Sequence, residues 1–148
     1  MTIADTSCLI LLDKIGRIDL LESVFGKITV TRRVAYEFQK QLPESFEITN
    51  PQDDNYQKLL MSFLDSGEAS VIALAVEQKD CLLIIDESRG RREVKSLGLK
   101  FTGTLGVLLI AKEKGIIKSV TELIDEIGRT NFRISEALLT EVKHKAGE

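Results

Sequence analysis

Short apolar runs alternate along this chain with longer stretches whose apolar residues recur at helical spacing. Residues 81–85 are apolar at every position, which is typical of a strand buried on both faces. Other short segments are rich in β-branched or aromatic residues, and we predict strands there as well. These segments are residues 2–4, 27–30, 46–49 and 100–102.

Amphipathic segments fill the intervals between the strands and the remainder of the chain. Helices are predicted at about residues 5–16, 18–25, 31–42, 52–64, 65–79, 87–97, 104–114, 119–127 and 134–145. Strands that alternate with helices predict a three-layer α/β/α domain with a mainly parallel central sheet of four to five strands. We expect one domain over residues 1–148, with a core at about 2–118 and a helical C-terminal extension at about 119–148. The apolar residues of the extension are expected to be buried within the monomer, with a dimer or partner surface as the alternative.

Composition narrows the class of protein. The chain has 148 residues, of which 43% are hydrophobic and 29% charged, and this balance is typical of a globular domain. The longest apolar run is too short to cross a bilayer, and the first residues lack the pattern of a signal peptide. We therefore expect a cytoplasmic protein that does not contact a membrane. The net charge of −3 gives no general electrostatic attraction to nucleic acid.

Cysteine and histidine are too few to support several kinds of chemistry. Cys8 and Cys81 both lie in apolar stretches, so we expect two buried, reduced thiols. The only histidine, His144, is in a polar C-terminal segment and is expected to be solvated. Catalysis by Ser-His-Asp or Cys-His groups and His-rich zinc sites are therefore excluded.

Acidic residues are the candidates for chemistry. The predicted elements place Asp5, Glu37, Glu68 and Asp86 near the carboxyl ends of strands, where open parallel sheets bind their ligands. Asp5 and Asp86 are also ordinary N-cap residues, and Glu68 forms a D-x-x-E capping box with Asp65. Glu37 is the most informative of these acids, because it lies beside the core-facing stripe of its helix and has only Arg33 as a local base.

A carboxylate cluster without histidine points to one type of catalysis. Carboxylates that are brought together repel each other and raise each other's pKa unless a cation lies between them. Mg²⁺ and Mn²⁺ suit such an all-oxygen site, and they can activate water and polarise a phosphate. The cluster therefore indicates metal-assisted phosphoryl chemistry.

Sequence motifs around these acids resemble those of PIN domains. Residues 3–10 are similar to the opening D-[TS]-[ST]-x-[LI] motif, and three further segments resemble the second, third and fourth motifs in order. These are residues 34–37, 67–75 and 83–87. The stretch 103–112, followed by Gly115, is similar to a bacterial and archaeal PIN-like subfamily with a Gly-Thr-Leu-Gly motif. The resemblance covers about residues 2–118.

The resemblance implies a PIN-like fold, a Mg²⁺ or Mn²⁺ cofactor and endonucleolytic cleavage of RNA. By position, it makes Asp5, Glu37, Glu68 and Asp86 the catalytic metal ligands, with Glu87 as an alternative to Asp86. Many relatives are similar to virulence-associated protein C, the toxin of a toxin–antitoxin pair, so an antitoxin partner and a homodimer are implied too. The chain departs from these toxins in having Glu68 where Asp is more familiar, and in the basic character of residues 87–92.

The resemblance also suggests a supporting role for a hydroxyl, since Thr6 or Ser7 would orient a carboxylate or a water molecule. Basic residues directly follow Asp86 on the helix expected to lie beside the site. Arg89 and Arg92 share a helix face at i, i+3 spacing and are candidates for binding phosphate, although pairing with nearby acids such as Glu87 and Glu93 is the alternative. Thr104 either offers its backbone N–H to phosphate or acts as an ordinary helix cap. Three lysines, Lys112, Lys114 and Lys118, are expected on a solvated face.

Three functions from different classes compete on this sequence. The first is a metal-dependent ribonuclease, which the complete set of acids favours. The second is a catalytically weak PIN-like module that binds RNA or protein. The third is an enzyme that uses Asp5 as a phosphate-accepting nucleophile, but residue 7 is Ser where the D-x-D phosphatases carry a second Asp.

Overall fold

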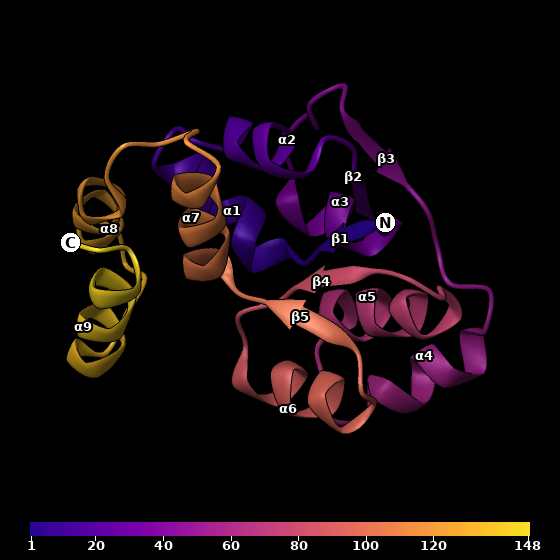
Figure 1. Ribbon diagram of the computed structural model, residues 1–148. Coiled ribbons are helices and arrows are strands. Elements are labelled where there is room, and N and C mark those ends of the chain that lie inside the picture. Colours follow the sequence, from indigo (N-terminus) through magenta and orange to yellow (C-terminus); the bar gives the residue numbers. More distant parts are fainter.

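The chain forms a five-stranded, fully parallel sheet with the strand order β3-β2-β1-β4-β5 (Figure 1). The computed structural model describes residues 1–148. The strands are β1 (Thr2–Ala4), β2 (Ile28–Val30), β3 (Phe46–Ile48), β4 (Leu82–Ile84) and β5 (Lys100–Thr102). Helices cover both faces of the sheet, so the predicted three-layer α/β/α architecture is confirmed.

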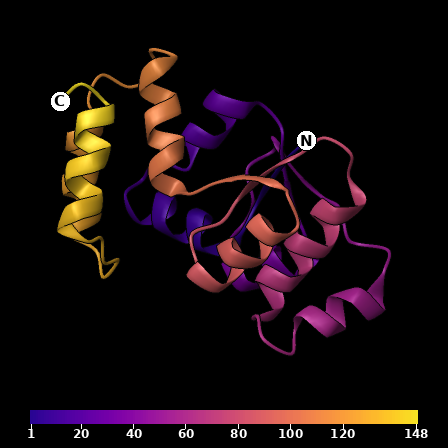
Figure 2. The ribbon, with the colours of Figure 1, turned by 60° about the horizontal axis from the view of Figure 1, so that its bottom comes forward.

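Nine helices connect and flank the strands. They are α1 (Thr6–Lys14), α2 (Asp19–Phe25), α3 (Arg32–Phe38), α4 (Asp54–Leu60), α5 (Ser66–Glu77), α6 (Ser88–Ser96), α7 (Thr104–Glu113), α8 (Val120–Gly128) and α9 (Glu136–Lys145). Helices α4, α5 and α6 lie on one side of the sheet, and α2 and α7 lie on the other (Figures 1 and 2). None of these helices has the length and hydrophobicity needed to cross a lipid bilayer.

The strand order reverses between β1 and β4, and this reversal positions the candidate site. From β1 the chain adds β2 and then β3 on one side, and it then returns to add β4 and β5 on the other side. Ala4 and Ile84, the last residues of β1 and β4, are partners in the parallel ladder. Asp5 and Asp86 therefore follow neighbouring strands at the same edge, the place where open α/β sheets form a crevice.

Two helices are shorter than their sequence pattern predicted. Helix α3 ends at Phe38 instead of about residue 42, because Gln39 adopts a left-handed conformation with φ of 61° and its N–H donates to the carbonyl of Ala35. Helix α4 begins at Asp54, since the side chain of Asp53 accepts the N–H of Tyr56, and it ends at Leu60. The prediction of a helix over residues 52–64 was therefore too long at both ends.

A single cluster of 35 buried apolar residues forms the core. It includes the interior of the sheet and also Val120, Leu123, Ile124, Ile127 and Val142 from the last two helices. The expected burial within the monomer is thus confirmed for these five residues, whereas Leu138 of α9 is 39% exposed. Cys8 and Cys81 are buried free thiols, and His144 is exposed, as predicted.

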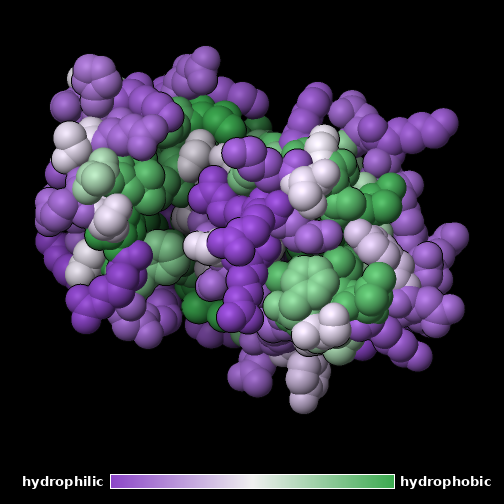
Figure 3. Space-filling view, turned by 90° about the horizontal axis from the view of Figure 1, so that it is seen from below, coloured by the Kyte–Doolittle hydropathy of each residue, from purple (hydrophilic) through white to green (hydrophobic).

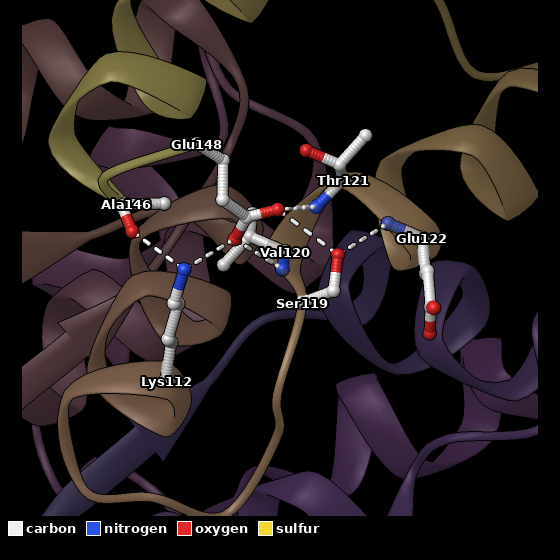
Figure 4. A network of polar contacts seen from close by, with 7 residues as sticks. All are labelled: Lys112, Ser119, Val120, Thr121, Glu122, Ala146 and Glu148. Carbon is white, nitrogen blue, oxygen red and sulfur yellow. Dashed lines mark hydrogen bonds and ion pairs between the residues drawn. The ribbon is translucent and has the colours of Figure 1, made fainter.

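The side chain of Glu148 ties the C-terminal helices to α7 (Figure 4). Its carboxylate accepts the N–H groups of Val120 and Thr121 at the start of α8, and also hydrogen bonds from Ser119 Oγ and Lys112 Nζ, at 2.7–3.0 Å. Lys112 also donates to the carbonyl of Ala146, so the expectation that this lysine lies on a solvated face was wrong. The Lys112 ammonium and the α8 N–H groups hold the pKa of Glu148 well below its ordinary value.

Replacing Glu148 tests this network. We expect Glu148→Gln to lower the melting temperature at pH 7, because the α8 N–H groups and Lys112 lose a charged acceptor. A carboxylate with a lowered folded-state pKa stabilises the fold above its unfolded pKa of about 4.3, and this contribution is lost as the pH falls further. The difference between wild type and variant should therefore shrink below about pH 4.

Thermal melts followed by circular dichroism between pH 3 and pH 8 measure this effect. Glu141→Gln is the matched control, because Glu141 forms only an exposed pair with Lys145 on α9. Equal melting temperatures for the two variants at every pH would contradict a stabilising role for Glu148.

Candidate active site

Asp5 and Asp86 are held in place by different hydrogen bonds at the ends of β1 and β4. Asp5 is 2% exposed, and its Oδ1 accepts the N–H of Thr6, the first residue of α1, at 2.8 Å. Asp86 accepts both the N–H and the hydroxyl of Thr104, at 2.8 and 2.6 Å. Asp86 is therefore not the cap of α6; Glu87 occupies that position and makes no side-chain capping bond.

Gly103 allows the contact between Asp86 and Thr104. A Cβ atom at Gly103 would lie 2.8 Å from Asp86 Oδ1, closer than real Cβ atoms come to a neighbouring atom. Because both donors of the buried Thr104 bind Asp86, Thr104 positions this carboxylate. The sequence suggests the Thr104 N–H as a donor to phosphate, whereas in the structure this N–H donates to a protein side chain.

Glu37 reaches the same edge from α3. The hydroxyl of Thr6 donates to Glu37 Oε1 at 2.9 Å, so Thr6 contacts two acids, one through its backbone and one through its side chain. Gly67 makes room for this carboxylate, since a Cβ atom at position 67 would overlap with Glu37 Oε1. Ser7, the other residue suggested for hydroxyl support, makes no side-chain hydrogen bond.

Glu68 lies in the first turn of α5 and is 6% exposed. Its N–H donates to Asp65 Oδ1 at 2.8 Å, but its own carboxylate returns no bond, so the predicted capping box is only half formed. Its Oε2 atom is buried and has no hydrogen-bond partner. A Cβ atom at Gly90 of α6 would lie 2.6 Å from this oxygen. A buried acceptor without a partner is costly, and it therefore marks a position that suits a ligand.

Asp65 is a member of the cluster that sequence reasoning missed. It raises the pKa of Asp5, Glu37 and Glu68 by charge repulsion. Its capping role explained its presence in the sequence, so nothing there marked it as a further acid of the site. The signal that could have identified it is its position as the N-cap of α5, three residues before Glu68.

Burial and mutual repulsion disfavour the charged forms of these acids. Burial raises the pKa of Asp5 to about 7, and repulsion from Asp65, Glu37 and Asp86 adds to this effect, while the Thr6 N–H opposes it. Burial likewise raises the pKa of Glu68 to about 8, with Asp65 as the next cause. The pKa of Glu37 is also raised, mainly by burial, despite the Thr6 hydroxyl. The cluster thus needs a cation, or protons, to be stable.

The donor set fits a hard divalent cation. Every candidate ligand is a carboxylate oxygen, the type that Mg²⁺ and Mn²⁺ prefer, and one buried oxygen, Glu68 Oε2, lacks a partner. As the side chains stand, no group of three or more His, Cys, Asp or Glu residues is arranged to hold a metal ion. The acids are electrostatic neighbours at one edge without forming a closed ligand set.

The candidate phosphate-binding arginines lie beside the acids. Arg89 lines a hollow of about 430 Å³ together with Asp65, Glu68 and Glu87. Arg92 and Arg89 line an adjoining hollow of about 240 Å³. Neither arginine forms an ion pair with a neighbouring acid, so their guanidinium groups are free to bind phosphate.

The acids thus gather where the strand order of a parallel α/β/α sheet reverses. A family model, DUF3368: PIN domain, matches residues 1–148. The chain belongs to this family of PIN domains. PIN domains are generally nucleases, and they typically use divalent metal ions. No curated protein and no solved structure matches the chain.

The close approach of Gly67 to Glu37 gives a prediction about the site of this PIN domain. Gly67→Ala should displace the Glu37 carboxylate, break its bond with Thr6, and lower the free energy of unfolding by about 1–3 kcal/mol. Urea unfolding measures the loss. Gly128→Ala is the control, because a Cβ atom there meets nothing within 4 Å; an equal effect of both substitutions would contradict the geometry.

The raised pKa of Asp5 gives a second prediction, for protein kept in EDTA. Because the folded state holds a proton on Asp5 up to about pH 7, and the unfolded state only to about pH 4, stability falls as the pH rises between these values. Asp5→Asn removes the buried charge and should raise the melting temperature at pH 8 by roughly 5–10 °C.

The matched control for this prediction is Asp54→Asn, which changes an exposed acid in the first turn of α4. Its melting temperature should follow that of the wild type at every pH. If Asp5→Asn destabilised the protein at pH 8 in EDTA, burial and repulsion would not be the dominant effects on Asp5.

Proposed function

We propose that this PIN domain is a metal-dependent endoribonuclease that hydrolyses RNA phosphodiester bonds, with a Mg²⁺ or Mn²⁺ ion held by Asp5, Glu37, Glu68 and Asp86. The observation that carries the proposal is Glu68 Oε2, a buried carboxylate oxygen without a partner, within a cluster of acids at the point where the strand order reverses. The general nuclease activity of PIN domains supports this interpretation.

The chain's own residues prepare the site by fixing the directions of the carboxylates. Thr6 holds Asp5 and Glu37, and Thr104 holds Asp86 with two donors. Both threonines are the first residues of helices, α1 and α7, so their bonds keep the acids in place before any ligand binds. A divalent ion, when bound, would activate water near neutral pH and polarise the phosphate.

Glu87 and Arg89 are exposed charged residues of the hollow that contains Glu68. Glu87 is exposed and lines the same hollow as Glu68, and this makes it a further carboxylate for the cation. Arg89 lines this hollow as well, and its guanidinium offers paired donors to a phosphate oxygen. Binding of RNA by this protein of net charge −3 then depends on local arginines instead of on its overall charge.

The resemblance to virulence-associated protein C extends the proposal to a biological role. We propose that the nuclease is the toxin of a toxin–antitoxin pair. It would act as a homodimer, and an antitoxin protein would block its activity. The support is the order of the four acidic motifs, which is the pattern that carries the resemblance.

Asp5→Asn and Asp86→Asn test the nuclease activity. In Mn²⁺ or Mg²⁺, the wild type should cleave a labelled single-stranded RNA, and each variant should be at least about 100-fold slower, because loss of a metal ligand exceeds the effect typical of its outer-shell partners. Isothermal titration should show Mn²⁺ binding to the wild type that Asp5→Asn abolishes.

The control is again Asp54→Asn, which should cleave RNA like the wild type. Undiminished cleavage by both site variants in EDTA would end the proposal. A wild type that binds RNA but neither binds Mn²⁺ nor cleaves would instead support the catalytically weak binding module. The absence of a closed ligand set is the observation that favours that second candidate.

A further inference from the structure

Phe63 is an exposed aromatic residue beside the acidic cluster. It lies between α4 and α5, and 43% of it is exposed in a chain in which only 5% of the residues are aromatic. Phe63 lines the hollow that contains Glu68 and Glu87, and it also lines the adjoining hollow that contains Arg89 and Arg92. Phe63 therefore shares one hollow with Glu68, Glu87 and Arg89, and a second hollow with Arg89 and Arg92.

The neighbouring arginines have no partner within the protein. Arg89 and Arg92 are both exposed, and neither makes a side-chain hydrogen bond or an ion pair, although Glu93 lines the same hollow as both. On the face seen from below, hydrophilic side chains form a stripe between two apolar areas (Figure 3). An apolar ring next to unpaired guanidinium groups matches the two chemical parts of a nucleotide, which are a flat base and a phosphate.

We propose that Phe63, Arg89 and Arg92 form a nucleotide-binding subsite beside the acids, in which Phe63 is the residue that contacts the base. One base stacks on Phe63, and a phosphate next to it binds Arg89 and Arg92. The inference rests on the proposed function for the choice of RNA as substrate. It adds the residues that contact a nucleotide of the bound strand, and among them the aromatic platform Phe63.

Single-strandedness follows from the geometry of stacking. Bases in a duplex are stacked on both sides, so a protein ring can contact a base face only where the strand is unpaired or at its end. Phe63 and Arg89 each line both hollows, so the bound nucleotide is adjacent to the acids. The base on Phe63 therefore lies in the hollow that Glu68, one acid of the cluster, also lines.

Binding is measured with cleavage disabled, so that the subsite and the nuclease activity are tested separately. In protein that carries Asp5→Asn, fluorescence anisotropy gives the affinity for a short labelled single-stranded RNA and for its duplex. Phe63→Leu should weaken single-strand binding by about 5- to 100-fold and leave duplex binding unchanged, whereas Phe63→Trp should retain single-strand binding. Arg92→Ala should weaken binding and reduce the slope of log affinity against log salt by roughly 0.7.

Two matched controls separate the subsite from general surface effects. Leu59→Ala removes another exposed apolar side chain, which is 63% exposed on α4, and Lys95→Ala removes a positive charge from the same helix as Arg92. Both controls should bind single-stranded RNA like the parent protein. Melting temperatures confirm that each variant is folded.

Several results would overturn the subsite. One is an unchanged affinity of folded Phe63→Leu protein for single-stranded RNA. Another is a parent protein that prefers the duplex or binds neither RNA. A third is a loss of affinity in Lys95→Ala as large as that in Arg92→Ala. Metal-dependent cleavage by wild type together with unchanged affinity of Phe63→Leu would remove this inference and leave the nuclease proposal standing. Binding that depends on Phe63, in a protein that never cleaves, would retain the subsite and remove the nuclease proposal.

Discussion

Repulsion between carboxylates that the fold holds in one crevice is the constraint on which the site depends. The reversal of strand order brings Asp5 and Asp86 to the same edge, and helices α3 and α5 add Glu37 and Glu68. Burial disfavours the charges of Asp5 and Glu68 further. Such a group destabilises a protein on its own, so the core of 35 apolar residues must offset it. In return, the fold presents a concentrated negative charge where a cation can bind.

The strands were largely predictable, whereas the end of α3 and both ends of α4 were not. All five strands lie within the segments that hydrophobic pattern and β-branched content indicated. Helix α3 stops earlier than predicted, because Gln39 takes a left-handed conformation, which favours glycine or asparagine and which sequence rarely signals for glutamine. The order of the strands also lay beyond local pattern, since pairing of β1 with β4 joins residues about 80 positions apart.

The site was predictable only where its residues could be recognised one at a time. The four acids follow from their positions after strands and in motifs, whereas Asp65 was hidden by its role as a cap. The partner of Thr104 could not be foreseen, because its contact with Asp86 joins the ends of two different strands. The same holds for Gly67 and Gly90, because side chains from other elements fill the space that a Cβ would occupy: Glu37 at Gly67, and Ile85 and Glu68 at Gly90.

The two hydrogen bonds of Thr6 limit the residue types that position 6 can accept. Its amide restrains Asp5 and its hydroxyl restrains Glu37, so one residue couples two acids that are 32 positions apart. A residue that kept the shape of threonine but lacked the oxygen would release Glu37 while Asp5 stayed in place. Serine and threonine supply both the N–H for Asp5 and the hydroxyl for Glu37. Natural variation at position 6 should therefore be confined to these two residues, which differ by one methyl group.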